Sequence, residues 1–259
     1  MKKFISFLIV LLLASVSFTS NAQECQRGDV NSDGAVDVAD VTCLISYILS
    51  GYWPEDTVTP SDEHQWVDLG LPSGTLWATR NVGASAPEDY GDYFAWGETA
   101  PKDYYDSNTY KWCNGTENTM TKYCTDSSYG YNGFTDGKTE LDPEDDAARV
   151  NWGSSWRMPS VDQIQELCDN CTWQWTQRNG VNGHLVTGPN GNTLFLPAAG
   201  FRLGESLYSA GSGGYYWSRT LLSDYPGYAY YLYFNSGDWG YGNGRSRVYG
   251  HPVRAVRVS

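Results

Sequence analysis

The chain has 259 residues, with 17 basic and 30 acidic side chains and a formal net charge of −13. A surface this acidic repels phosphate backbones and anionic membranes, so the composition excludes nucleic acid as an expected partner. The same charge favours calcium, a hard cation that binds oxygen ligands.

The first 22 residues have the three-part pattern of a cleaved secretory signal. Lys2 and Lys3 precede an apolar run over residues 4–16, and the small residues Ser20 and Ala22 follow it. The alternative is a membrane anchor, but the run is shorter than the roughly 20 apolar residues of a spanning helix. We therefore expect a signal peptide over residues 1–22 and a secreted or cell-surface protein that is not membrane-spanning.

Residues 29–40 have the residue spacing of a calcium loop. Side-chain oxygens occupy loop positions 1, 3, 5, 9 and 12, Gly34 stands at position 6, and Ala35 at position 7 offers its carbonyl. The predicted calcium ligands are Asp29, Asn31, Asp33, Ala35, Asp37 and Asp40. The alternative is a polar turn that binds no metal, but a plain turn does not require this ordered spacing.

A helix is expected only after this loop, where Val41, Leu44, Ile45, Ile48 and Leu49 recur at helical spacing. The run 28–49 closely resembles a dockerin repeat, which has this loop-helix form with Asp at position 12. The resemblance implies a calcium unit over residues 23–53 that docks a cohesin-like partner. This chain shows one repeat where dockerins carry two. Val38 and Ala39 stand at positions 10 and 11, where dockerins often have Ser or Thr.

A stretch with two prolines, residues 54–65, is interpreted as a linker to a larger domain over residues 66–259. In that domain we predict strands at 66–69, 76–79, 93–96, 215–218, 228–234 and 253–258, and a hairpin of 184–187 with 193–196. Helices are predicted from Asp142 and from Ser160, the second with a capping box completed by Gln163. Two helices among many strands predict the α+β class.

Several segments of this domain together resemble the Fibrobacter succinogenes major paralogous (FISUMP) domain. They are residues 67–84, 93–98, 156–160, 194–202, 214–218 and 253–257. The resemblance implies a C-type-lectin-like fold but no established activity, and members of that fold bind sugars or proteins.

Eleven Trp and 20 Tyr residues invite a glycan-stacking hypothesis, although aromatic residues also fill cores and cover strands. Tyr225, Tyr228, Trp239 and Tyr241 lie among Gly, Asn, Asp and Ser, and they are the candidate ligand-binding residues. Arg254 and Arg257 alternate with apolar residues on the last strand, which predicts internal salt bridges.

All six cysteines follow the signal peptide, and export permits disulfides. Proximity in the sequence suggests Cys25 with Cys43, Cys113 with Cys124, and Cys168 with Cys171, and other connectivities remain open. Cys168 and Cys171 have thioredoxin-like spacing, but they fall late in a predicted helix, which favours structural thiols.

No catalytic residues are predicted, because the three histidines stand outside any nucleophile or metal motif. The sequence predicts a secreted or cell-surface, non-catalytic binding module whose cofactor is Ca²⁺ and whose ligand is a glycan, the host matrix or a surface protein. The alternative is an accessory component of a polysaccharide-degrading assembly, tethered through the dockerin-like unit. A third hypothesis is an enzyme acting on polysaccharides.

Overall fold

The computed structural model describes Val41 and residues 64–258. The chain from His64 onward forms one compact unit. The predicted signal peptide, the calcium unit and nearly all of the predicted linker lie outside the described residues, apart from Val41. Their boundaries therefore stay predictions.

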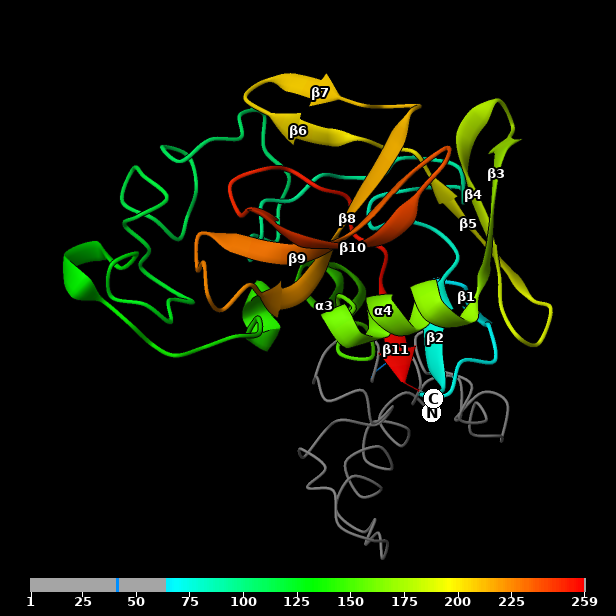
Figure 1. The fold of residues 1–259 in the computed structure, drawn as a ribbon, viewed down its shortest axis with the longest axis horizontal. Helices are drawn as coiled ribbons and strands as arrows, with labels where there is room; N and C mark the ends of the chain where they lie inside the picture. Colours follow the sequence, from blue (N-terminus) through cyan, green and yellow to red (C-terminus); the bar gives the residue numbers. More distant parts are fainter. Residues whose placement is uncertain (1–40, 42–63, 259) are drawn as a thin grey trace, which may run out of the picture. The chain divides into compact units, whose positions relative to one another are not determined.

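Four antiparallel sheets build the described unit (Figure 1). The first has the strand order β1-β2-β11, with bounds Trp66–Asp68, Thr75–Ala78 and Val256–Val258. The second is β3-β4-β5, with bounds Thr172–Arg178, Val181–Thr187 and Thr193–Pro197. The third is β10-β9-β8, in which β8 is Gly213–Leu221, β9 is Tyr228–Asn235 and β10 is Trp239–Ser246. The fourth pairs β6 (Phe201–Leu203) with β7 (Ser206–Tyr208).

Two α-helices and two 3-10 turns complete the elements of residues 64–258. The helices are α3 (Ala147–Trp152) and α4 (Val161–Asn170), and the turns are η1 (Tyr131–Gly133) and η2 (Pro143–Asp145). Helix α4 begins as predicted: Ser160 accepts a hydrogen bond from Gln163 N, and the Gln163 side chain accepts one from Ser160 N. The helix expected from Asp142 is instead divided between η2 and α3.

Asp146, rather than Asp142, caps helix α3. Its carboxylate accepts backbone N–H groups of Ala148, Arg149 and Met158, at 2.9 to 3.1 Å. Burial raises the pKa of Asp146 against the opposing effect of these hydrogen bonds. The cap therefore also fixes the chain before α4 against the start of α3.

The α+β prediction is wrong, because the described unit is a β-rich fold. Strands β3, β6, β7 and β10 form where no strand was predicted, and the two helices have only six and ten residues. Strand β10 escaped prediction because three glycines and few apolar residues hide its alternation, and its pairing with β9 supplies the order that its composition lacks. The predicted strand at 93–96 contributes a single bridge, between Phe94 and His251.

One core cluster lies beneath α4. Ile164 and Leu167 of α4 are completely buried against residues of three sheets, among them Trp77, Trp173, Leu196, Tyr216 and Phe234. Burying a side chain of this size contributes about 1.5–3 kcal/mol, so the short helix is held by packing rather than by its own propensity.

A second region of the core anchors the long loop over residues 103–140. The fully buried Arg247 donates to the carbonyl oxygens of Lys122, Tyr123 and Pro226 and to the Tyr110 hydroxyl. Asp136 accepts the N–H groups of Tyr123 and Cys124. These hydrogen bonds, rather than the Cys113–Cys124 disulfide that the sequence suggested, hold the loop.

The four described cysteines are free thiols, so neither pair suggested within this unit is bonded. The Cys113 thiol donates a hydrogen bond to Ser107 O, and the Cys124 thiol donates one to Asp126 O. Each thiol therefore bonds to a carbonyl oxygen close to it in the sequence. Cys168 and Cys171 pack with the core under α4, and burial raises the pKa of Cys168 to about 12 and that of Cys171 to about 11. At neutral pH both are thus protonated, as expected of structural thiols. Cys25 and Cys43 lie outside the described residues.

The internal salt bridge predicted for Arg254 is also absent from the described residues. Arg254 is fully buried and donates to Asn81 Oδ1 and Ala78 O, which are neutral acceptors. Burial lowers the pKa of Arg254 to about 10. Among the described residues, no helix is both long and apolar enough to cross a membrane.

Candidate ligand-binding site

The predicted calcium ligands, Asp29, Asn31, Asp33, Ala35, Asp37 and Asp40, lie outside the described residues. Within residues 64–258, no group of three or more His, Cys, Asp or Glu side chains is arranged to hold a metal ion. The candidate ligand-binding sites of this unit are its cavities and its exposed aromatic side chains.

The four predicted ligand-binding aromatics fall into two separate groups. Trp239 and Tyr241 lie two residues apart on β10, and 39% and 43% of their surface is exposed. Trp239 stacks on Trp173 of β3, with ring centroids 5.9 Å apart. Tyr225, which is 55% exposed, and the half-buried Tyr228 instead lie where the chain enters β9. The structure does not bring all four together on one surface.

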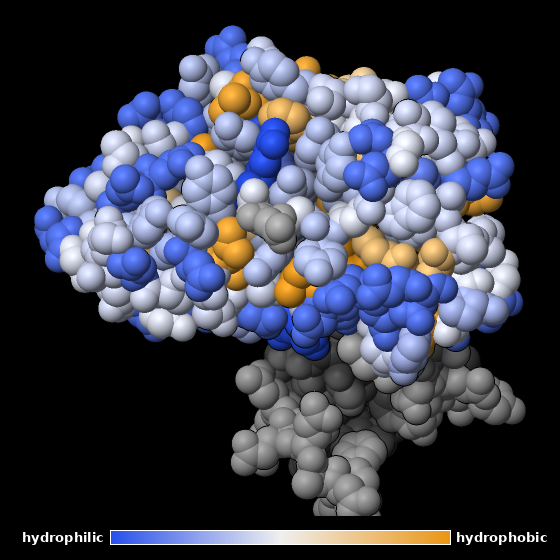
Figure 2. All heavy atoms as spheres, in the orientation of Figure 1, coloured by the Kyte–Doolittle hydropathy of each residue, from blue (hydrophilic) through white to orange (hydrophobic). Residues whose placement is uncertain are grey.

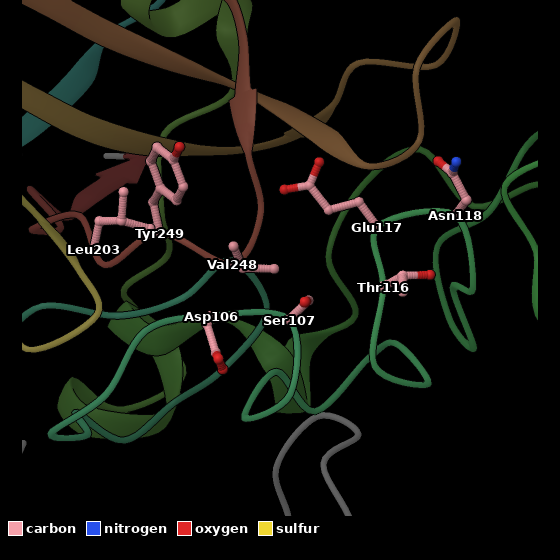
Figure 3. Close-up of a pocket in the computed structure, with 8 residues that line it drawn as sticks. All are labelled: Asp106, Ser107, Thr116, Glu117, Asn118, Leu203, Val248 and Tyr249. Atoms are coloured by element: carbon pink, nitrogen blue, oxygen red, sulfur yellow. The ribbon is translucent and has the colours of Figure 1, made fainter.

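An open cavity of about 470 Å³ lies elsewhere, between the long loop and the end of the chain (Figure 3). This volume falls within the range of small-ligand sites. We call it the Glu117 pocket, and its lining residues are Asp106, Ser107, Thr116, Glu117, Asn118, Leu203, Val248 and Tyr249.

Long-range backbone pairing assembles this pocket. Tyr105 and Gly204 exchange two hydrogen bonds of 3.0 and 2.9 Å, which bring Asp106 beside Leu203. Arg202 and Gly250 exchange two more, of 2.7 and 3.0 Å, which bring Tyr249 to the same place. Gly250 is needed there because a Cβ atom would lie 2.6 Å from the buried Tyr105 ring.

The two carboxylates of the pocket have different surroundings. Asp106 is occupied by its own turn, where it accepts hydrogen bonds from Asn108 N, Asn108 Nδ2 and Thr109 N at 2.9 to 3.0 Å. The hydrogen bond from the Asn108 side chain is the largest cause that holds the pKa of Asp106 below its ordinary value. Asp106 is therefore a structural acid with little capacity for ligand.

Glu117 is the available acid. Its Oε1 accepts a hydrogen bond from Ser246 Oγ, and within the described residues its Oε2 has no hydrogen-bond partner. Figure 3 shows the Glu117 side chain extending toward Tyr249, whereas the Asp106 carboxylate points away from both. The nearby Glu117 charge raises the pKa of Tyr228. One carboxylate oxygen is thus free to accept hydrogen bonds from a bound molecule.

Tyr249 forms part of an aromatic cluster beside the pocket. Its ring stacks with Phe201 of β6 at a centroid distance of 5.8 Å. The Arg245 guanidinium lies 4.3 Å from the Phe201 centroid, 5.1 Å from that of Tyr249 and 5.4 Å from that of Tyr215. Cation–π contacts of this kind fix both the cation and the rings.

Beneath this cluster lies His251, which is fully buried and stacks on Trp217 with centroids 3.9 Å apart. Among the described residues, neither of its ring nitrogens has a hydrogen-bond partner. Burial, followed by the charge of Arg245, holds the pKa of His251 well below its ordinary value. The histidine is therefore neutral at physiological pH, and its ring packs against Trp217 as an aromatic side chain of the core.

The molecular surface shown in Figure 2 mixes polar and apolar residues. In the face shown by Figure 2, hydrophobic residues gather only in small groups between hydrophilic ones. A broad apolar patch would mark a protein-protein interface. This face shows no such patch among the described residues.

Sequence reasoning missed Glu117 and Tyr249. Glu117 falls in the polar stretch 103–140, which the sequence identified only as a long loop, and Tyr249 stands in a short Gly-bounded run. The Ser246–Glu117 contact joins residues 129 positions apart, so no local pattern could have paired them.

Comparison with known proteins gives one match. Residues 27–68 match the family model of the dockerin type I domain. The matched range contains the whole predicted calcium loop and extends across the predicted linker to the end of β1. No curated protein and no solved structure matches the chain. The FISUMP resemblance of residues 66–258 thus stays a prediction, and the β-rich fold corrects the lectin-like arrangement that it implied.

Proposed function

We propose that the chain is an exported component of a calcium-dependent protein assembly, attached through residues 27–68. The observation that carries this proposal is the match of those residues to the dockerin type I domain. Dockerin domains bind calcium and dock cohesins, and they are typical of extracellular assemblies. The secretory signal pattern of residues 1–22 supports the same destination.

The residues of the predicted calcium loop support the proposed calcium dependence. Asp29, Asn31, Asp33, Asp37 and Asp40 would supply side-chain oxygens, and Ala35 would supply its carbonyl. Calcium bound by these ligands would enable residues 27–68 to dock a partner in the manner of the dockerin type I domain. Val38 and Ala39 are apolar where dockerins often have Ser or Thr, so recognition of a cohesin would differ at these two positions.

The larger unit is proposed to be a non-catalytic binding module carried by the docking unit. The geometry of the Glu117 pocket supports this. A glycosidase needs two carboxylates that face the scissile bond. In the pocket, however, the Asp106 carboxylate is held by Asn108 and Thr109 and points away from Glu117 (Figure 3). A single free carboxylate suits binding better than hydrolysis.

Calorimetric titration of calcium into the mature chain, residues 23–259, tests the first part. An Asp29→Ala/Asp33→Ala variant should lose the site, because it removes two of the ligand carboxylates. The matched control is Asp103→Ala/Asp224→Ala, which removes the same charge from exposed positions of the larger unit. A wild-type chain that binds no calcium would overturn the proposal.

Docking is tested separately with immobilised cohesin modules in calcium and in EGTA. Binding that requires calcium and is lost in Asp29→Ala/Asp33→Ala supports attachment through residues 27–68. Calcium binding without retention on any cohesin would contradict the docking role. It would leave a free secreted or cell-surface binding module, whose ligand is a glycan or the host matrix, as the function.

A further inference from the structure

We propose that the Glu117 pocket, together with the tyrosine-rich face that adjoins it, binds a neutral oligosaccharide. This inference rests on the proposed role of the larger unit as a binding module and names its ligand class. It differs from the four aromatics that the sequence suggested, none of which lines the pocket.

The polar wall of the pocket offers unused hydrogen-bonding groups. Three groups of this wall make no hydrogen bond to the described residues: Glu117 Oε2, the Ser107 hydroxyl and the Asn118 side-chain amide. The neighbouring Asp106 and Thr116 side chains, by contrast, are hydrogen-bonded. Glu117 itself is held in position by Ser246. A carboxylate, a hydroxyl and an amide together match the alternating donors and acceptors of adjacent sugar hydroxyl groups.

The opposite wall is apolar and prearranged. Tyr249 is fixed by its stack on Phe201 and by Arg245, and Leu203 and Val248 extend the apolar surface below it. Aromatic rings bind the C–H faces of sugars with little loss of conformational entropy, because a tyrosine ring already fixed by packing has little freedom left to lose. The pocket therefore combines the two requirements of a sugar site.

The aromatic surface continues beyond the pocket across the third sheet. Tyr215 of β8, Tyr233 of β9 and Gly240 of β10 lie in one row across the strands. In the next row Tyr231 lies beside Gly242, while Trp217 of β8 is fully buried. Tyr215 also lies against Phe201 and Arg245, so this face is joined to the cluster around Tyr249.

Glycines keep the β10 side of this face flat. A Cβ atom on Gly242 would lie 2.1 Å from the Tyr231 ring, so only glycine lets that ring lie over β10. A Cβ atom on Gly240 would meet nothing within 4 Å, which leaves open space beside Tyr233. Half-buried tyrosine rings therefore lie beside the bare backbone of β10 on this face.

The charges favour a neutral ligand. Glu117 and the overall charge of −13 disfavour uronic acids and phosphates at the pocket. Arg245, whose guanidinium lies 5.1 Å from the Tyr249 ring centroid, disfavours a cationic ligand there. A neutral polyol avoids both repulsions and still satisfies the free hydrogen-bonding groups.

Affinity gel electrophoresis of the full mature chain tests the inference. The gels would contain mixed-linkage β-glucan, glucomannan, arabinoxylan or galactan, and polygalacturonate would serve as the charged comparison. Retardation by at least one neutral polysaccharide is expected. Glu117→Gln and Tyr249→Ala should each weaken binding about tenfold or more, through loss of a charged acceptor or of the stacking ring.

The controls are Glu205→Gln, which removes an exposed acid outside the pocket, and Trp66→Ala, which removes an exposed aromatic ring on β1 of another sheet. Both should bind as the wild type does. Near-ultraviolet circular dichroism checks that each variant is folded. Tyr249→Phe keeps the stacking ring, so it should bind the polysaccharide as the wild type does.

Three outcomes would overturn the inference. The first is that no neutral polysaccharide retards the wild type. The second is that polygalacturonate alone retards it. The third is that Trp239→Ala and Tyr241→Ala abolish binding, whereas Glu117→Gln and Tyr249→Ala do not. Retention of calcium-dependent cohesin binding in any of these cases would leave the assembly proposal intact. Glycan binding by Asp29→Ala/Asp33→Ala would in turn show that the pocket acts without the docking unit.

Discussion

At the residue scale, Arg247 is a buried cation whose described partners are neutral. It donates to three carbonyl oxygens and one hydroxyl, and its guanidinium lies 4.8 Å from the Trp96 centroid. A planar fork with five donors can reach four separate acceptors, whereas an ammonium group cannot. The arginine therefore joins the long loop to the core by geometry rather than by charge pairing.

We expect Arg247→Lys to lower the free energy of unfolding by about 3 kcal/mol or more, because buried carbonyl oxygens lose their donors. Urea denaturation followed by tryptophan fluorescence measures this. Arg178→Lys is the control, because Arg178 is partly exposed and pairs with Glu88 at the surface. That change should stay within about 0.5 kcal/mol of the wild type. Equal stability of the two variants would contradict the role given to Arg247.

His251 gives the unit a dependence on pH. It is neutral when folded, because burial and then Arg245 lower its pKa well below the ordinary value, and burial lowers the pKa of His184 in the same direction. Unfolded histidines bind protons as the pH falls through about 6.5, so the unfolded state gains protons that the folded state does not. Stability is then fully present above about pH 6.5 and declines below it.

Thermal unfolding between about pH 7.5 and about pH 5.5 should therefore show a falling midpoint for the wild type. His251→Phe keeps an aromatic ring against Trp217 and removes the titrating group, so its midpoint should fall less steeply over the same range. Tyr225→Phe, at an exposed site, should follow the wild type. Identical slopes for wild type and His251→Phe would exclude His251 as the cause.

At the element scale, helix α4 depends on both its cap and its packing. Ser160 and Gln163 form the capping box, and Gln163 also accepts from Arg219 Nη1 and donates to Thr75 Oγ1. The N-terminus of the helix is thereby tied to strands β8 and β2. A local sequence motif has become a junction between two sheets.

Ser160→Ala should lower the free energy of unfolding by about 1 kcal/mol, because a helix N–H group loses its acceptor. Chemical denaturation measures the change, with Ser127→Ala as the control at an exposed position. Ser160→Thr keeps the oxygen and should recover most of the loss. A loss that Ser160→Thr does not recover would indicate a packing effect in place of the cap.

The elements also show where sequence patterns succeed. The hairpin predicted around residues 188–192 forms as β4 and β5, and Gly191 adopts the positive φ of 86° that the turn needs. Helix α4 begins at its predicted cap. Both signals act within a few residues of the chain, so neither depends on the rest of the fold. Strand β10 depends on pairing with β9, and for this reason its own residues did not reveal it.

At the scale of the whole molecule, the unit from His64 onward contains its own core clusters and folds as one compact body. Its described residues hold no group arranged for a metal ion. Because packing in its own core clusters stabilises this unit, we expect its stability to be independent of calcium. Calcium should instead act on the unit matched by the dockerin type I domain.

Differential scanning calorimetry of the mature chain in calcium and in EGTA tests this division. One transition should be unchanged by chelation, and any calcium-dependent change should be lost in Asp29→Ala/Asp33→Ala. The Asp103→Ala/Asp224→Ala chain should behave as the wild type in both conditions. A main transition that shifts with calcium would show that the larger unit also binds the ion.

The sequence by itself determined features that are local in the chain, the cap of α4 and the β4–β5 hairpin. It also contains the ordered oxygen-bearing side chains of residues 29–40, within the range that the dockerin type I domain matches. Only the tertiary structure decided the β-rich class, the free state of the four described cysteines and the Glu117 pocket. Caps, turns and metal loops are specified by contacts within about a dozen residues. The pocket arises where Tyr105 meets Gly204, Arg202 meets Gly250 and Ser246 meets Glu117, and only the folded chain brings those residues together.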